Sequence, residues 1–293
     1  MKFRKYHGLG NDYLVINPTD LCQEFDETII CQICHRNTGV GSDGILLGPF
    51  FPGSDDFQQI CREAGISAEK AADSLAALRI FNPDGSEAEK SGNGFRIFSR
   101  FLYDRGLVGH EPFQLATLGG MVRAQVIDPE NRIQVEMGRV SFLSPEIPVS
   151  GPVREVIREE VEIDGRKFVF CAAGIGNPHC VVLDEQISSS LAREFGPRLE
   201  THALFPHKTN VQFLQVKDRH NIAIEIWERG AGYTLASGSS ASACAAVAVK
   251  LGLCQSPVTV WMPGGQLQTS ISADFQLTQT GPVKYVFTAL WPE

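Results

Sequence analysis

The sequence has no apolar run of the roughly 18–20 residues that a membrane-spanning helix requires. It also has no Lys/Arg-rich run, and its formal net charge is -8. These features argue against a membrane protein and against a nucleic-acid-binding surface. The N-terminal stretch MKFRKYHGLGNDY lacks the uninterrupted apolar core of a signal peptide. We therefore expect a cytoplasmic protein.

Paired zinc-binding cysteine motifs are also missing, although the chain has eight cysteines, at positions 22, 31, 34, 61, 171, 180, 244 and 254. One segment, CQICH (Cys31 to His35), matches the CxxCH pattern of covalent haem attachment. That chemistry needs an exported chain, and the segment is also typical of an amphipathic helix with Ile30, Cys31 and Cys34 facing inward. We interpret the match as a coincidence and expect reduced thiols.

The chain does contain an internal repeat. The segment LRIFNPDGSEAEKSGNG aligns without a gap with IEIWERGAGYTLASGSS, 146 residues later. In this alignment Ser91-Gly92 falls on Ser237-Gly238. Self-similarity over a fixed offset indicates repeated structure.

A second pair of similar segments lies upstream, GLGNDYLVI and GIGNPHCVV, with Asn11 matching Asn177. Two ordered blocks indicate a duplication of the whole unit. Because Asn11 lies 80 residues before Ser91 but Asn177 only 60 before Ser237, the first half carries 20 extra residues. We expect them within 51–78, as one or two inserted helices.

Each half has mostly short strand-like segments and one clear helix, which begins after Ser91 or Ser237. Both helices are apolar or small on more than one face, which is typical of a buried helix. We predict an α+β fold of two pseudo-symmetric domains, each a curved mixed β-sheet or barrel wrapped around a central helix. The predicted N-terminal domain is 1–117 plus 279–293 and the C-terminal domain is 118–278, with a seam near 116–122 and an active-site cleft between them.

The repeated element suggests a chemical site. A helix N-terminus has free N–H groups and a partial positive charge, so it attracts a carboxylate. Two such termini about a pseudo-twofold axis would enclose a small anion, with one side chain on each side of it. This geometry suits a two-base racemase or epimerase, in which one group removes an α-proton and the other delivers a proton to the opposite face. A symmetric binding protein and a purely structural repeat remain alternatives.

At these residues the chain resembles the diaminopimelate epimerase family of cofactor-independent amino-acid racemases and epimerases. The resemblance covers nearly the whole chain and rests on the motifs KYHGLGNDYLVI, RNTGVGSDGILL, IFNPDGSEAEKSGNG, GIGNPHCVV, FPHKTNVQF and WERGAGYTLASGSS. It implies interconversion of LL- and meso-diaminopimelate in lysine and peptidoglycan synthesis. It also implies no pyridoxal phosphate or other cofactor, no metal, and a possible homodimer.

The resemblance assigns roles to individual residues. Side-chain amides of the substrate pocket would be Asn11, Asn82, Asn177 and Asn210. The distal amino and carboxylate groups of the substrate would be read by Glu228 and Arg229. The backbone cradle for the reacting carboxylate would be formed by Gly92, Asn93, Gly238 and Ser239, with His179 as a supporting residue. Without the resemblance, the asparagines are interpreted as turn residues, and Glu228 with Arg229 as an exposed ion pair.

The chain departs from the family at its two catalytic bases. These are cysteines in the family and fall on Ser91 and Ser237 here. A thiol, with a pKa of about 8.5, can be tuned to a thiolate, whereas an alcohol normally needs an adjacent base. Candidate neighbours for that task are Glu87, Glu89, Glu228 and His179. Cys244 lies two helical turns beyond Ser237, and we expect it in the core.

Two further positions differ. Gly44 stands where the family usually has Gln, and Tyr233 where it has Glu. These differences favour a naturally divergent member over a chain whose two cysteines were replaced to inactivate it. A divergent member would be an epimerase, a different isomerase or a non-catalytic amino-acid-binding protein. The expected partner is a small amino acid, with neither nucleic acid nor a membrane.

Overall fold

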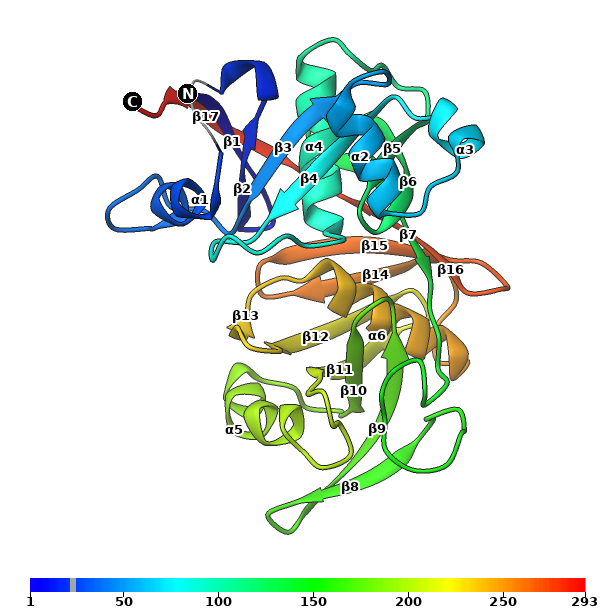
Figure 1. Ribbon diagram of the computed structural model, residues 1–293. Helices are drawn as coiled ribbons and strands as arrows, with labels where there is room; N and C mark the ends of the chain where they lie inside the picture. The colour runs from blue at the N-terminus through cyan, green and yellow to red at the C-terminus, as the bar shows by residue number, and fades with distance from the viewer. Residues whose placement is uncertain (22–24, 293) are drawn as a thin grey trace. The chain divides into compact units, whose positions relative to one another are not determined.

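The computed structural model describes residues 1–21 and 25–292, and Figure 1 shows their path. Contacts divide the chain into two compact units. Unit 1 is Met1–Val135 together with the residues from Gly281 onward, and unit 2 is Glu136–Thr280. Within the described ranges, no helix is both long and apolar enough to cross a membrane.

The strands of unit 1 form a mixed sheet. In hydrogen-bonded order they are β17 (Lys284–Leu290), β1 (Lys2–Gly8), β2 (Asn11–Ile16), β3 (Ile45–Phe50), β4 (Ala76–Phe81), β5 (Phe113–Thr117), β6 (Gly120–Asp128) and β7 (Arg132–Arg139). Neighbours are antiparallel except for two parallel pairs, β2 with β3 and β4 with β5.

Unit 2 repeats this series. Its strands are β8 (Glu159–Ile163), β9 (Arg166–Gly174), β10 (Pro178–Leu183), β11 (Asn210–Asp218), β12 (Asn221–Glu228), β14 (Val258–Met262), β15 (Gly265–Ile271) and β16 (Gln276–Gly281). A short strand, β13 (Gly232–Thr234), adds to β12. The parallel pairs are β10 with β11 and β12 with β14, which are the counterparts of those in unit 1. The duplication predicted from the sequence is confirmed.

Each unit has one helix against the concave face of its sheet. In unit 1 this is α4 (Gly92–Asp104), which packs on β1, β2 and β6. In unit 2 it is α6 (Gly238–Lys250), which packs on β9, β10, β11, β12, β14 and β15. Both helices have 13 residues and start and end at positions 146 apart. The predicted curved mixed sheet around a central helix is confirmed.

A second helix covers the outer face of each sheet. In unit 1 it is α1 (Glu27–Cys34), after β2, and in unit 2 it is α5 (Ser189–Glu200), after β10. α1 lies on the segment interpreted from the sequence as an amphipathic helix, whereas α5 was not expected. In α1, Ile33 and Cys34 are buried but Cys31 is only half-buried, so the inward face differs slightly from the predicted one.

The predicted insertion lies between β3 and β4. It contains α2 (Asp55–Glu63) and α3 (Ala68–Ala72), and α2 packs against β4 and β5 (Figure 1). A short 3-10 helix spans Pro18–Asp20.

The first predicted domain boundary came too early. Residues 118–135 belong to unit 1, because β6 forms a tight hairpin with β5 in which Ala116 pairs with Met121. The predicted seam at 116–122 is this hairpin, whose ladder hydrogen bonds keep both strands in one sheet. The chain enters unit 2 within β7.

Strand alternation separates the two faces of each sheet. In β2, Leu14 and Ile16 join the apolar cluster under α1, and in β10, Cys180 and Val182 join the cluster under α5. Because neighbouring side chains of a strand point to opposite faces, Tyr13 and His179 face the central helices. The sheet register thus directs one polar ring in each unit toward a helix N-terminus.

Candidate active site

Ser91 caps the N-terminus of α4. Its backbone is extended, and its Oγ accepts a hydrogen bond from the N–H of Gly94 at 3.0 Å. A Cβ on Gly94 would come within 3.1 Å of Leu46 and of the Ser91 side chain, so only glycine fits this first turn without a shift. The first-turn N–H groups carry the partial positive charge of the helix dipole, which favours a carboxylate there.

A tyrosine hydroxyl lies against Ser91. The Oη of Tyr13 is 3.1 Å from the Oγ of Ser91, and Tyr13 is 7% exposed. The sequence-derived candidates for a partner of Ser91 did not include this residue. Its position two residues after Asn11, matching His179 two residues after Asn177, was the available signal.

Asn11, one of the predicted amides, meets Asn93, a residue of the predicted cradle, beside Ser91. Asn93 Nδ2 donates to Asn11 Oδ1 at 2.9 Å, and Asn11 Nδ2 donates to Asp43 Oδ2 at 3.0 Å. Asn93 Oδ1 accepts from Arg96, which is fully buried in α4. Burial lowers the pKa of Arg96 to about 9. Asn93 is therefore held on both sides, and it orients Asn11.

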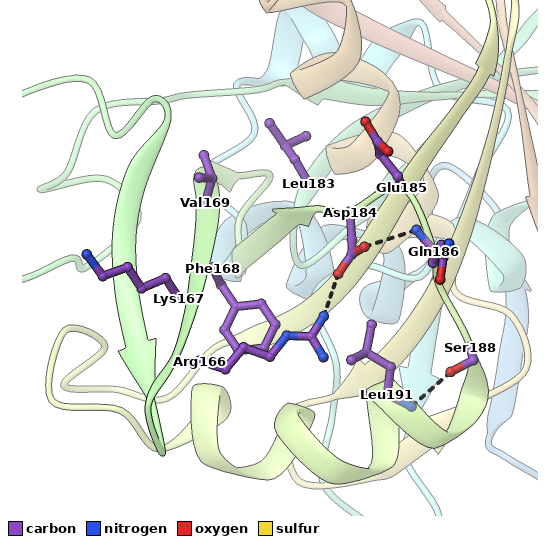
Figure 2. Close-up of a pocket in the computed structure, with 10 residues that line it drawn as sticks. All are labelled: Arg166, Lys167, Phe168, Val169, Leu183, Asp184, Glu185, Gln186, Ser188 and Leu191. Carbon is purple, nitrogen blue, oxygen red and sulfur yellow. Dashed lines mark hydrogen bonds and ion pairs between the residues drawn. The ribbon is translucent and has the colours of Figure 1, made fainter.

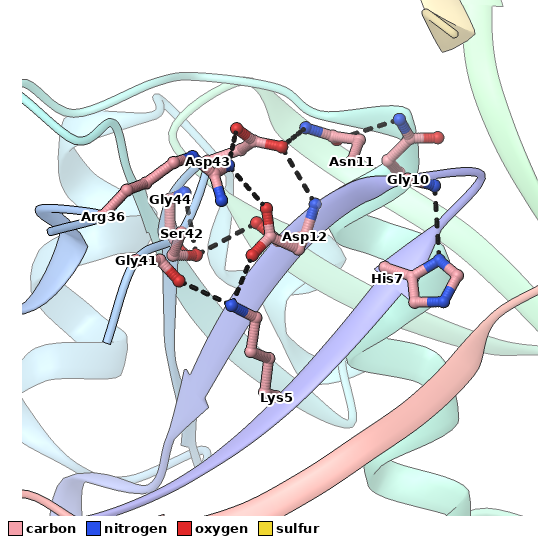
Figure 3. A network of polar contacts seen from close by, with 11 residues as sticks. Lys5, His7, Gly10, Asn11, Asp12, Arg36, Gly41, Ser42, Asp43 and Gly44 are labelled. Carbon is pink, nitrogen blue, oxygen red and sulfur yellow. Dashed lines mark hydrogen bonds and ion pairs between the residues drawn. The ribbon is translucent and has the colours of Figure 1, made fainter. Parts of the chain in front are cut away.

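An ion-pair network lies next to Asn11, as Figure 3 shows. Asp12 contacts Lys5 Nζ at 2.7 Å and Arg36 at 2.9 Å, and Arg36 also reaches Asp43 at 2.6 Å. Burial opposes ionisation of Asp12, but hydrogen bonds from Lys5 and Arg36 outweigh it and lower its pKa. The charged carboxylates fix the end of β2 that carries Asn11.

Ser237 caps α6 in the same way as Ser91 caps α4. Its backbone is extended, and its Oγ accepts from the N–H of Ser240 at 3.5 Å. Its Oγ also lies 3.4 Å from Ser239 Oγ. A Cβ on Gly238 would come within 2.9 Å of Gln279 Oε1, so the glycine admits this buried amide, which donates to Gly238 O at 2.8 Å.

The amide pair of unit 1 has a counterpart in unit 2. Asn177 Nδ2 donates to Ser239 Oγ at 3.5 Å, as Asn93 and Asn11 pair in the first unit. His179 Nε2 lies 2.9 Å from Asn177 Oδ1. Burial lowers the pKa of His179 to about 3, so the imidazole is neutral at physiological pH. His179 thus orients Asn177.

Two further polar side chains of unit 2, those of Asn210 and Glu200, order the loop after β12. Asn210 Oδ1 accepts from the backbone N–H of Arg229 at 2.9 Å, while its Nδ2 donates to Pro178 O at 2.9 Å. Glu200, which the sequence did not suggest, accepts from Trp227 Nε1 at 2.7 Å and from the Gly230 N–H at 3.2 Å. These contacts fix the backbone that carries Glu228 and Arg229.

Asn82 behaves as a turn residue in unit 1. Its Nδ2 donates to Ser86 Oγ at 3.0 Å, and its backbone N–H donates to Ser86 O at 2.8 Å. Glu87 forms an ion pair with Arg79 at 2.8 Å, and Glu89 accepts from the Gly119 N–H through its backbone carbonyl. The turn holds Asn82 through Ser86, and Glu87 is engaged by Arg79.

The two atypical positions have distinct structural settings. A Cβ at Gly44 would lie 2.5 Å from the carbonyl oxygen of Phe81 and 2.7 Å from Tyr13 Cε1, so the glycine leaves room for the Tyr13 ring. Tyr233 donates to Glu225 at 2.6 Å and lies under the guanidinium of Arg193. Burial, with that hydrogen bond, raises the pKa of Tyr233 to about 12.

The described cysteines are free thiols. Cys180 and Cys244 are fully buried, and burial raises the pKa of both thiols well above the usual value. They are core residues, as expected. In the ranges 1–21 and 25–292, no cluster of His, Cys, Asp and Glu side chains is arranged to hold a metal ion.

A pocket of about 600 Å³ lies on the α5 side of unit 2 (Figure 2). Its lining residues are Arg166, Lys167, Phe168, Val169, Leu183, Asp184, Glu185, Gln186, Ser188 and Leu191. Phe168 and Leu191 belong to the cluster under α5, whereas His179 faces α6. The pocket is therefore separate from the groups around Ser237.

Comparison with known proteins gives a consistent result. A family model described as diaminopimelate epimerase matches residues 3–143 and 171–286. The chain is 56% identical over 283 residues to diaminopimelate epimerase 2 of Nostoc sp., covering 97% of this chain and 93% of that protein. It is 37% identical over 295 residues to the diaminopimelate epimerase of Desulfitobacterium hafniense, covering 98% and 96%.

A solved structure shares the fold. The hydroxyproline epimerase from Agrobacterium vitis, with bound trans-4-OH-L-proline, matches with a TM-score of 0.65 at 13% sequence identity. The match covers 99% of this chain and 91% of that one. At this identity the likeness supports the architecture alone.

Proposed function

Because the chain belongs to the diaminopimelate epimerase family, we propose that it interconverts LL- and meso-diaminopimelate by cofactor-independent two-base proton transfer. The observation that carries this proposal is the pair of matched helix N-termini. Each begins at a capping serine, Ser91 or Ser237, and each has a side-chain amide hydrogen-bonded to its second helical residue. A duplicated site of this kind suits a reaction that treats both faces of one carbon alike.

In the proposed reaction, the first-turn N–H groups of α4 and α6 bind the α-carboxylate of the substrate. They stabilise the negative charge that develops when the α-proton leaves. Ser91 and Ser237 act on opposite faces of the α-carbon. One serine accepts the α-proton at its Oγ while its own hydroxyl proton passes to an adjacent base, and the other serine delivers its hydroxyl proton to the opposite face and is then reprotonated, so the configuration inverts.

The other predicted pocket residues act in binding. Asn11, Asn177 and Asn210 present oriented amides to the substrate, and Asn82 adds a fourth at the end of β4. Glu228 and Arg229 pair with the distal amino and carboxylate groups, which is a charge-complementary arrangement. Gly92, Asn93, Gly238 and Ser239 line the carboxylate cradle. We place this enzyme in the cytoplasm, in lysine and peptidoglycan synthesis, as a homodimer.

The decisive experiment measures α-proton exchange. The purified chain is incubated with LL-diaminopimelate in deuterated water, and deuterium at the α-carbon and the appearance of the meso isomer are followed by mass spectrometry and NMR. We expect both in the wild type. Ser91→Ala and Ser237→Ala should each lower the rate by roughly 10²–10⁴, the usual contribution of a general acid or base.

Ser54→Ala and Ser188→Ala are matched controls, because these serines cap α2 and α5 through the same kind of hydrogen bond. They should cost stability without lowering the exchange rate. Thermal stabilisation by the amino acid without any exchange would instead identify a binding protein and contradict the epimerase proposal.

A further inference from the structure

We propose that Tyr13 is a positioning residue that enables Ser91 to serve as an acid–base group, by holding the Ser91 hydroxyl and exchanging a proton with it. This inference rests on the proposed function. It supplies what a serine in place of a thiol lacks, namely an adjacent group that can take up the hydroxyl proton.

The contact is direct and the tyrosine is firmly placed. Tyr13 Oη lies 3.1 Å from Ser91 Oγ, within hydrogen-bond distance, and the ring is buried on the α4 side of β2. Ser91 Oγ also accepts from the Gly94 N–H at 3.0 Å, which fixes the oxygen at the helix N-terminus. The Ser91 hydroxyl oxygen is therefore held from two sides.

The neighbouring strand is built around the tyrosine. Gly44 lies one residue before the Leu14–Ile45 pair of the parallel β2–β3 ladder, and so beside Tyr13. Any side chain at Gly44 would have its Cβ 2.7 Å from Tyr13 Cε1 and 2.5 Å from the rigid carbonyl of Phe81. The ring can lie where it does because position 44 has no Cβ.

Unit 2 has a histidine at the position that corresponds to Tyr13, and the contacts there are different. His179 is the counterpart of Tyr13, and its register partner Asn210 is the counterpart of Gly44. The imidazole contacts Asn177 at 2.9 Å, and Ser237 Oγ pairs with Ser239 Oγ at 3.4 Å. The phenol–serine contact is therefore a specific feature of unit 1 and not a consequence of the shared fold.

The proton transfer balances within the pair. With Tyr13 ionised, Ser91 Oγ accepts the proton of the substrate α-carbon while the Ser91 hydroxyl proton passes to the Tyr13 oxygen. The electron pair of the broken C–H bond stays on the substrate, next to the carboxylate. In the reverse direction Ser91 returns a proton to the α-carbon and Tyr13 returns one to Ser91.

The test uses Tyr13→Phe, which removes the hydroxyl and keeps the ring. With LL-diaminopimelate, we expect kcat to fall by roughly 10², the low end for a lost proton-transfer partner, while KM changes by less than about threefold. Tyr6→Phe is the matched control, because Tyr6 donates to Asp104 at 3.0 Å in the same unit. It should leave kcat unchanged.

A thiol at position 91 separates a proton-transfer role from a structural one. In a Ser91→Cys background the base no longer needs the phenol, so adding Tyr13→Phe should change kcat by less than about threefold in this double-mutant cycle. An equal loss of kcat in both backgrounds would show a structural role only and overturn the inference.

The two proposals fail differently. An active wild type whose Tyr13→Phe variant keeps its kcat overturns the role of Tyr13 and leaves the epimerase function intact. A wild type without α-proton exchange overturns the proposed function and this inference together.

Discussion

The two helix N-termini of this protein share one frame but hold their serines differently. In unit 1, Ser91 contacts the phenol of Tyr13, and the neighbouring amides rest on a network of charged side chains. In unit 2, Ser237 contacts another serine, and the neighbouring amide rests on a neutral, fully buried histidine. Each capping serine with its neighbouring amide forms a half-site. The same backbone therefore supports one half-site whose amides rest on charged side chains and one whose amide rests on a neutral histidine.

The difference begins with one residue on the adjacent parallel strand. Gly44 leaves room for a ring that reaches the helix cap, whereas Asn210 uses the same register position to tie Pro178 to Arg229. A duplicated fold can thus diverge in chemistry through a single change of side-chain volume.

Removing the charge beneath the unit 1 half-site should have the largest effect on stability. Asp12→Asn leaves Lys5 without its carboxylate in a mostly buried setting, and we expect the free energy of unfolding to fall by about 3 kcal/mol. Asp184→Asn, which breaks a half-exposed pair with Arg166 in unit 2, should cost less than about 1 kcal/mol. Denaturant titration measures both.

The direction of the Asp12 pKa shift also determines how its contribution to stability depends on pH. Because folding lowers the pKa of Asp12, its contribution is present above the unfolded value of 3.8 and is lost as the pH falls through the folded pKa. The difference between wild type and Asp12→Asn should therefore shrink in acid. Equal losses for Asp12→Asn and Asp184→Asn would contradict the larger contribution assigned to the buried Asp12 network.

Thiols should affect the two caps unequally. Ser237→Cys replaces the hydroxyl by a thiol, which is a stronger acid. The recorded contacts of the Ser237 hydroxyl are with Ser239 Oγ and the Ser240 N–H, which are both weak acids. The thiol should therefore raise the exchange rate by roughly 10². Ser91→Cys should raise it less, because Tyr13 already assists that position. Equal gains, measured by deuterium exchange, would argue that the two serines are equivalent.

Substituting Gly44, which lies beside the Tyr13 ring, or Asn210, which lies beside the His179 imidazole, should have a smaller effect on stability. Gly44→Asn forces the side chain against Phe81 O and Tyr13, so we expect a loss of about 1–3 kcal/mol in stability, with a fall in kcat as Tyr13 moves from Ser91. Asn210→Gly should cost a similar 1–3 kcal/mol, roughly, because two backbone groups lose their partner. A Gly44→Asn variant with wild-type stability would contradict the packing argument.

The smallest expected effect near neutral pH is the pH response of the buried histidine. His179 has a pKa of about 3 in the fold, against 6.5 for an ordinary histidine. Between these values the unfolded chain binds a proton that the folded chain does not, so stability falls as the pH drops below 6.5 and is constant above it. One pH unit below that value the loss is about 1 kcal/mol.

His179→Gln should flatten this slope, and His207→Gln, at an exposed position, should not. Unfolding midpoints recorded between pH 4 and pH 7, roughly the range below the ordinary histidine pKa, measure it. A His179→Gln slope as steep as that of the wild type would show that the titrating group lies elsewhere.

The sequence predicted the repeat, the central helices and the inserted helices correctly, because these depend on local patterns. Ser91 and Ser237 are capping serines before apolar helices, and capping and helix burial follow from neighbours in the chain. The sequence did not predict α5 or the end of the first unit. The boundary depends on a ladder between β5 and β6, and not on composition near residue 117.

The candidate site was predicted only in part. The pairing of Asn11 with Asn93, and of Asn177 with Ser239, joins residues from motifs that the sequence had already singled out. Asn82 was assigned to the pocket, and the structure adds that its amide donates to Ser86 Oγ within a turn. Tyr13, Asp12 and Glu200 were missed, because each has a partner that lies 24 to 78 residues away in the sequence.

By itself, the sequence determined that this chain is a duplicated α+β protein with a capping serine at each central helix. Periodicity, capping and self-similarity are properties of neighbouring residues and can be read without a structure. Only the tertiary structure decided which group meets each serine, because strand register sets that contact. Tyr13 reaches Ser91 across 78 residues through the alignment of β2 with β3 and the missing side chain of Gly44.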